Sequence, residues 1–116
     1  MNVRNTLKKN SDFRRLYTKG KSAVTPCLVL YCRKGRGEGI RTGYTVSAKL
    51  GHAVVRNRIR RQLREIVRLN TPALRPGHEL VLVARGRAVG ADYHRLERDF
   101  LTACKKLGLM RGEDLK

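Results

Sequence analysis

The chain has 116 residues, a length that fits one domain with a modest hydrophobic core. Its 27 lysines and arginines against 9 acids give a formal net charge of +18 and an isoelectric point of about 11.1. Such a charge favours a polyanion, such as nucleic acid, as partner. The apolar runs are too short to span a bilayer, and no apolar segment follows the charged N-terminus, which argues against a membrane protein and a signal peptide.

The three cysteines, Cys27, Cys32 and Cys104, form no C-x-x-C motif. An odd number of cysteines without close pairing favours a reducing cytoplasm over a disulfide framework. If Cys27 and Cys32 belong to one extended strand, their odd spacing places them on opposite faces, so we predict no bond between them.

Residues 10–19 are predicted to form a short first helix, which the polar residues at its start can cap and Gly20 can end. Phe13 and Tyr17 lie one turn apart and share its apolar side, where their ordinary role would be to anchor the helix to a core. Arg14 and its neighbours make the same helix basic.

Residues 21–33 are predicted to form a strand that is interrupted at Pro26, because proline cannot donate to a central ladder. Beyond the proline the residues alternate, with Tyr31 and Arg33 on the face opposite Leu28. A solvated sheet face that carries an aromatic ring and an arginine suits base stacking and phosphate contact.

Residues 41–49 are predicted to form a second alternating strand. One side of it would hold Tyr44, and the other would hold small or polar residues that include Ser47 and Lys49. Small side chains on that side would leave a shallow trough on the sheet instead of a packed face.

A single amphipathic helix is predicted over residues 51–69. Its apolar stripe, at helical spacing, consists of Val55, Ile59, Leu63 and Ile66. The polar residues that oppose or flank this stripe are Arg56, Asn57, Arg58, Arg60, Arg61, Arg64 and Arg68. Only one acid, Glu65, offsets these arginines, which indicates a polyanion as the missing counter-charge. The use of arginine and not lysine favours bidentate recognition of phosphate.

A Pro-Gly turn precedes a predicted strand over residues 78–85 and a final helix that Asp92 caps and Gly108 ends. The apolar stripe of this helix consists of Tyr93, Leu96, Phe100, Ala103 and Leu107. Asp99 lies one turn after Arg95 and is expected to pair with it.

The predicted order is helix, strands, helix, strand, helix, which defines an α/β domain with its helices packed on one sheet. We find no internal repeat, so residues 1–116 are predicted to form one RNA-binding domain with flexible ends at residues 1–7 and 111–116. The acids are dispersed and the 3 histidines lie in different elements. We therefore expect no catalytic side chain and no metal held tightly by the protein.

The order of residues in the central helix is more specific than its charge. Gly51 followed by Ala-Val-Val-Arg-Asn-Arg-Ile-Arg-Arg at residues 53–61 resembles the signature of the bacterial ribonuclease P protein component family. The segments Lys-Lys-Asn-Ser-Asp-Phe at residues 8–13 and Gly-Tyr-Thr-Val-Ser-Ala-Lys at residues 43–49 look like further parts of that family. The resemblance can be followed over roughly residues 7–108.

This resemblance implies a particular fold. It is a two-layer α+β sandwich in which a four-stranded sheet packs with three helices, similar to the second domain of ribosomal protein S5. It also contains a left-handed β-α-β crossover. That handedness runs against the general rule, and no pattern in the sequence predicts it.

The resemblance also implies a role in removing the 5′ leader from precursor tRNA. The catalytic element would be RNA, with Mg²⁺ held mainly by that RNA. Apart from the resemblance, we expect one protein monomer for each RNA, and the cysteines favour the cytoplasm. Contacts to the catalytic RNA are implied for Arg56, Asn57, Arg58, Arg60, Arg61 and Arg64, and Arg68, which the helical periodicity places on the same polar face, is expected to join them. Contacts to the leader are implied for Phe13, Tyr17 and Tyr31. On physical grounds Arg14, Arg33 and Lys49 could follow the leader backbone, and Ser47 of the predicted trough is expected to join this leader site.

Two other functions share the basic charge of this chain. A structural RNA-binding protein of the ribosomal type, without a role in tRNA processing, would not need the residue order of 51–61. A DNA-binding protein could place the central helix in a major groove, but no helix-turn-helix partner precedes that helix.

Overall fold

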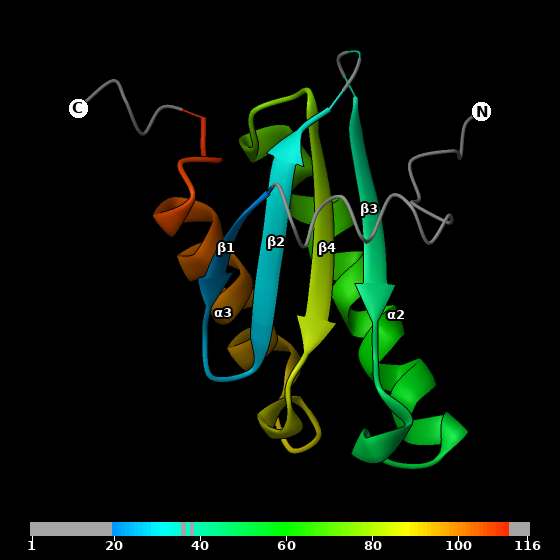
Figure 1. The fold of residues 1–116 in the computed structure, drawn as a ribbon. Helices are drawn as coiled ribbons and strands as arrows, with labels where there is room; N and C mark the ends of the chain where they lie inside the picture. The colour runs from blue at the N-terminus through cyan, green and yellow to red at the C-terminus, as the bar shows by residue number, and fades with distance from the viewer. Residues whose placement is uncertain (1–19, 36, 38, 112–116) are drawn as a thin grey trace.

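The computed structural model describes residues 20–35, 37 and 39–111 of the chain (Figure 1). The four strands are β1 (Lys21–Val24), β2 (Leu28–Lys34), β3 (Ile40–Thr45) and β4 (His78–Ala84). The helices are α2 (Ala53–Asn70), α3 (Tyr93–Lys106) and the 3-10 helices η1 (Ala48–Leu50), η2 (Thr71–Ala73) and η3 (Gly86–Ala88). The predicted helix over residues 10–19 lies outside the described residues.

The strands form one mixed sheet in the order β1-β2-β4-β3, and both α2 and α3 lie on the same face of it (Figure 1). This confirms the predicted α/β class with its two layers. Neighbouring strands run antiparallel except β3 and β4, which are parallel. The long connection between those two parallel strands is α2, as the β-α-β unit requires.

The β3-α2-β4 crossover is left-handed. In Figure 1 both strands point downwards, α2 passes behind the sheet, and β4 lies to the left of β3. The great majority of such crossovers have the opposite hand. The resemblance to the ribonuclease P family implied this arrangement, and the observed topology agrees with it.

The interruption predicted at Pro26 is the turn of a β-hairpin between β1 and β2. Thr25 closes this turn, with its Oγ1 donating to the Leu28 carbonyl at 2.7 Å. The prediction that Cys27 faces away from Cys32 was wrong, since both side chains lie in the same core. Strand alternation does not apply to Cys27, because β2 begins one residue later.

The second predicted strand ends earlier than expected. β3 stops at Thr45, and the predicted strand end over residues 46–49 instead turns into η1. Ser47 causes this change, because its Oγ accepts a hydrogen bond from the Lys49 backbone N–H at 3.1 Å and caps the 3-10 helix. Ser47 and Lys49 therefore lie on the exposed connection to α2 and not in the sheet.

The main core lies between the sheet and the two helices. The side chains at its centre, each with an exposed fraction of 0–1%, are Leu28, Leu30, Ile59, Leu63, Ile66, Leu80, Leu82, Leu96 and Phe100. These residues include three of the four predicted for the apolar stripe of α2 and two of the five predicted for that of α3. No helix among the described residues is long and apolar enough to cross a membrane.

The cap of α3 follows the prediction, because Asp92 Oδ1 accepts a hydrogen bond from the Arg95 backbone N–H at 2.8 Å. Asp99, expected to pair with Arg95, is buried, and its Oδ2 accepts a bond from the Cys27 backbone N–H at 2.8 Å. This long-range bond joins the hairpin turn to α3. It also satisfies a backbone donor that would otherwise be buried without a partner.

All three cysteines are free and buried. Burial raises the pKa of the Cys104 thiol to about 12, and burial is also the main cause that raises the pKa of Cys27 and Cys32. The thiolate is the reactive form, so we expect a thiol reagent at pH 8 to label none of the cysteines rapidly in the folded protein. After unfolding without reductant, all three should react. A titration that finds only one thiol would contradict the absence of a disulfide.

Candidate nucleic-acid interface

The exposed face of α2 carries most of the predicted arginine cluster. Ile59, Leu63 and Ile66 have no exposed surface and hold the helix against the sheet. The polar residues consequently turn away from the core. The exposed ones are Asn57, Arg58, Arg61, Arg64 and Arg68, while Arg56 and Arg60 are half-buried.

The α2 arginines differ in how they are held. Arg56 Nε donates to the Gly51 carbonyl at 3.1 Å, and Arg58 Nη2 donates to the Val89 carbonyl at 2.9 Å. Arg60 Nη1 donates to Asn57 Oδ1 at 3.0 Å. Neutral partners of this kind fix the side chain but leave its positive charge uncompensated.

Among the residues that the structure describes, Arg68 is the α2 arginine with an acidic partner. It donates to both carboxylate oxygens of Glu65, at 3.0 and 2.6 Å, and these hydrogen bonds lower the pKa of that carboxyl group. Arg61 and Arg64, in contrast, form no hydrogen bond or ion pair with a described side chain. Both side chains are exposed, and no described acid offsets their charge in an ion pair.

The sheet face opposite α2 and α3, here called the outer face, is organised in rows across the strands. One row pairs Val29 of β2 with Val83 of β4, and the next pairs Tyr31 with Val81. Tyr31 and Val83 pack against Val81, which is fully buried. In the Tyr31 row, β3 contributes Gly43, so no side chain projects from β3 at this position of the outer face.

The third row of the outer face is a set of three charges. Arg33 of β2 and Arg41 of β3 lie on either side of Glu79 of β4, because β4 lies between those two strands. Arg33 Nε is 2.8 Å from Glu79 Oε1, and Arg41 Nη1 is 3.3 Å from Glu79 Oε2. The carboxylate is almost fully buried while both arginines stay partly exposed.

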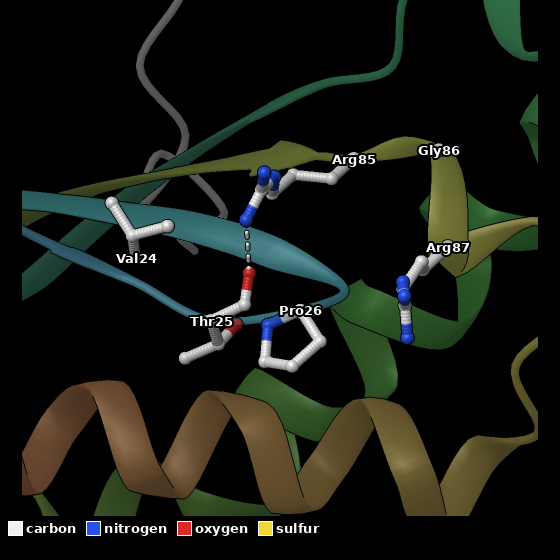
Figure 2. A pocket seen from close by; sticks show the side chains of 6 residues that line it. All are labelled: Val24, Thr25, Pro26, Arg85, Gly86 and Arg87. Atoms are coloured by element: carbon white, nitrogen blue, oxygen red, sulfur yellow. Dashed lines mark hydrogen bonds between the residues drawn. The ribbon is translucent and has the colours of Figure 1, made fainter.

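A basic pocket of about 710 Å³ lies between the hairpin turn and the segment after β4 (Figure 2). Arg85 crosses this space and its Nη1 donates to the Thr25 carbonyl at 2.8 Å, while Arg87 lines the same pocket. A smaller hollow of about 350 Å³ shares Arg87 and adds Arg95. These arginines cluster at the end of the sheet where η1 also lies (Figure 1).

The predicted site residues thus fall into three groups. The α2 residues form one exposed surface, and Tyr31 and Arg33 lie on the outer face of the sheet. Ser47 and Lys49 lie beyond the end of β3, away from Arg33. The other predicted leader contacts, Phe13, Arg14 and Tyr17, lie outside the described residues.

Sequence reasoning missed Arg41, Glu79, Arg85 and Arg87. The pairing of Arg41 with Glu79 depends on β3 and β4 being neighbours, which only the topology shows. The two arginines of the basic pocket had a sequence signal, since Arg-Gly-Arg directly follows a buried strand. Within residues 20–35, 37 and 39–111, no three His, Cys, Asp or Glu side chains gather in a way that could hold a metal ion.

A mixed sheet, an arginine-lined crossover helix and a net charge of +18 define a small basic α/β protein of the nucleic-acid-binding class. The family model Ribonuclease P matches residues 1–108, and the chain belongs to this family. It is 42% identical to the ribonuclease P protein component of Natranaerobius thermophilus, over 91% of this chain and 92% of that protein. The corresponding protein of Alkaliphilus oremlandii is 38% identical over 97% and 98%.

Solved structures of the family share the fold. The RNase P protein of Staphylococcus aureus matches with a TM-score of 0.85 at 29% identity, over 92% of this chain and 98% of that one. The Thermotoga maritima protein matches with a TM-score of 0.77 at 28% identity, over 84% and 92%. Membership makes the chain a protein component of an endoribonuclease and a partner of ribonuclease P RNA.

Arg58 and Arg61 are both exposed on α2 but differ in their contacts within the protein. Arg58→Ala removes the bond that joins α2 to the segment before α3, whereas Arg61→Ala removes no such bond. We expect Arg58→Ala to lower the midpoint of thermal unfolding by about 3–5 °C, the effect of one hydrogen bond. Arg61→Ala should leave the midpoint unchanged. Equal midpoints for the two variants would show that the Val89 contact does not stabilise the fold.

Proposed function

We propose that the chain binds the catalytic RNA of ribonuclease P through α2 and the 5′ leader of precursor tRNA through the outer face of the sheet. It would thereby assist the endonucleolytic cut that gives mature tRNA its 5′ end. The observation that carries this proposal is the division of basic residues between two surfaces that face different ways. One polyanion cannot easily occupy both.

The α2 surface suits a structured RNA. Its arginines stand on a helix that is held against the sheet by Ile59, Leu63 and Ile66, which have no exposed surface. Arg58 and Arg60 are held by neutral groups, and Arg61 and Arg64 extend into solvent. Phosphates spaced along an RNA helix would supply the negative charge that the helix lacks, and the guanidinium fork matches phosphate geometry.

The outer face suits a single strand. Tyr31 is an aromatic residue of this face that packs against the buried Val81, and a base of any kind can stack on such a ring. Arg33 lies two residues further along β2 on the same face, about 7 Å away along the strand. Ser47, Lys49 and the pocket arginines lie at the opposite end of the sheet, so a strand of RNA can follow β2 and β4 from one basic end to the other.

The remaining parts of the proposal follow mainly from the family resemblance. Catalysis would belong to the RNA subunit, and the Mg²⁺ of the holoenzyme would be held mainly by RNA. One protein monomer would serve each RNA subunit, in the cytoplasm. The dispersion of the 9 acids along the chain agrees with a supporting role for the protein side chains.

The purified chain should stimulate leader cleavage only when the catalytic RNA is present. Arg60→Ala and Arg64→Ala should raise the protein concentration needed for half-maximal stimulation and lower the log–log salt slope of RNA-subunit binding by up to about one unit each. Arg98→Ala, an exposed arginine of α3, is the control with the same loss of charge. Stimulation without catalytic RNA, or equal effects of all three variants, would contradict the proposal.

Tyr31→Ala tests the outer face separately. Loss of one ring–base stack costs roughly 1–3 kcal/mol, so the variant holoenzyme should bind leader-bearing precursor tRNA up to about a hundredfold more weakly. Binding of mature tRNA should barely change, because mature tRNA has no leader. The measurement is holoenzyme affinity for both tRNAs at one salt concentration. Equal losses for both tRNAs, or none for the precursor, would mean that Tyr31 is only a packing residue.

A further inference from the structure

We propose that Glu79 is a positioning residue that makes the outer face selective for the leader. It would hold Arg33 and Arg41 as a fixed pair of guanidinium groups that receives one backbone phosphate next to the base stacked on Tyr31. This inference rests on the proposed function of the outer face. It assigns a role to an acid that, by charge alone, should weaken RNA binding.

Glu79 is unusual for its place. Among the described residues of β1 to β4 it is the one acid on the outer face, and its exposed fraction is only 4%. Each of its two oxygens accepts from a different arginine, at 2.8 Å from Arg33 Nε and 3.3 Å from Arg41 Nη1. The carboxylate therefore bridges two strands that are not themselves neighbours in the sheet.

The stem of Glu79 is also held from below. A Cβ atom placed on Gly35 would lie 2.9 Å from Glu79 Cγ, so the side chain packs directly on the Gly35 backbone. That backbone is fixed in turn, because the Gly35 N–H donates to the Gly77 carbonyl at 2.8 Å. A loop on one side and an arginine on each flank leave the carboxylate little freedom to move.

The arrangement is better suited to binding than to stability. A buried carboxylate loses its hydration, and an ion pair recovers this loss only with good geometry and further hydrogen bonds. An apolar residue would continue the Val81 and Val83 side of β4 without that loss. The arginines, however, stay partly exposed, with side-chain fractions of 21% for Arg33 and 42% for Arg41. Glu79 uses Nε of Arg33, so both Nη groups of that arginine can still donate to a phosphate.

The two possible roles of Glu79 predict different effects of Glu79→Gln on the affinity for RNA. If the carboxylate only neutralises charge, Glu79→Gln adds a net positive charge and strengthens binding of every RNA. If it positions the arginines, the same substitution releases two flexible side chains that can reach any phosphate. Affinity for the leader then falls relative to affinity for the rest of the tRNA. The ratio of precursor to mature tRNA affinity therefore separates positioning from screening.

The experiment compares holoenzymes that carry wild-type protein, Glu79→Gln or Glu97→Gln. Glu97 lies on α3, accepts a hydrogen bond from Asn70, and gives a control with the same change of charge away from the outer face. We expect Glu79→Gln to lower the precursor-to-mature affinity ratio about tenfold, the loss of one charge-assisted contact. Affinity for the RNA subunit and the ratio of the Glu97→Gln enzyme should not change.

A variant that leaves Glu79 in place keeps the result decisive if Glu79→Gln unfolds the protein, and a triple variant tests whether Glu79 acts through the two arginines. Arg33→Lys with Arg41→Lys keeps both charges but removes the guanidinium forks, and it should lower the ratio by a similar factor. In a background of Arg33→Gln with Arg41→Gln, adding Glu79→Gln should change the ratio no further. An unchanged ratio in Glu79→Gln or in the double lysine variant would overturn the inference. A wild-type enzyme without any preference for precursor tRNA would instead contradict the proposed function itself.

Discussion

The packing of the α2 stripe on one face of the sheet determines what both surfaces of the molecule can do. Ile59, Leu63 and Ile66 leave no exposed area at this contact, so the rotation of the helix about its axis is fixed. That rotation turns the arginines outwards. Because α3 packs beside α2 on the same face, the outer face of the sheet is left for other contacts among the described elements. The apolar core therefore sets the direction of the charges.

A chain with a net charge of +18 has to restrain its arginines as well as display them. Arg58 is tied to a backbone carbonyl, Arg68 to Glu65, and Arg33 to Glu79. The two kinds of hydrogen-bond partner have different effects on the charge of the arginine. A carbonyl fixes the side chain and leaves the charge intact, whereas a carboxylate also offsets part of the charge. Regions where arginines bind carbonyl groups therefore stay strongly cationic, whereas regions where arginines bind carboxylates are less cationic.

Local features of the sequence predicted local features of the structure well. The crossover helix, the strand after the Pro-Gly turn and the Asp92 cap depend on periodicity and capping, which act within a few residues. The errors arose where one residue overrides a pattern, as Ser47 does by capping η1. Cys27 shows the same effect, since the hairpin turn removes it from the strand alternation that would have placed it on the other face.

The contact between Arg41 and Glu79, which the sequence did not predict, joins residues that are far apart in the chain. Arg41 and Glu79 are 38 residues apart, and they meet because β3 and β4 are parallel neighbours across a left-handed crossover. Composition and spacing do not encode that handedness, so only a family resemblance could suggest it. The basic character of each surface was predictable, whereas the partner of each arginine required the topology.

Selectivity is the harder problem for a protein of this charge. Its field attracts any RNA, and outside a Debye length of about 8 Å at physiological salt the attraction is largely screened and unspecific. Discrimination has to come from short-range contacts whose geometry is fixed before the RNA arrives, because a flexible cation follows whichever phosphate is near. On the outer face, the contacts that we propose for this role are a ring packed on Val81 and guanidinium groups held by a buried carboxylate. An acid within a basic surface is therefore consistent with RNA binding. It weakens the unspecific attraction of RNA, but it holds the guanidinium donors in a defined arrangement.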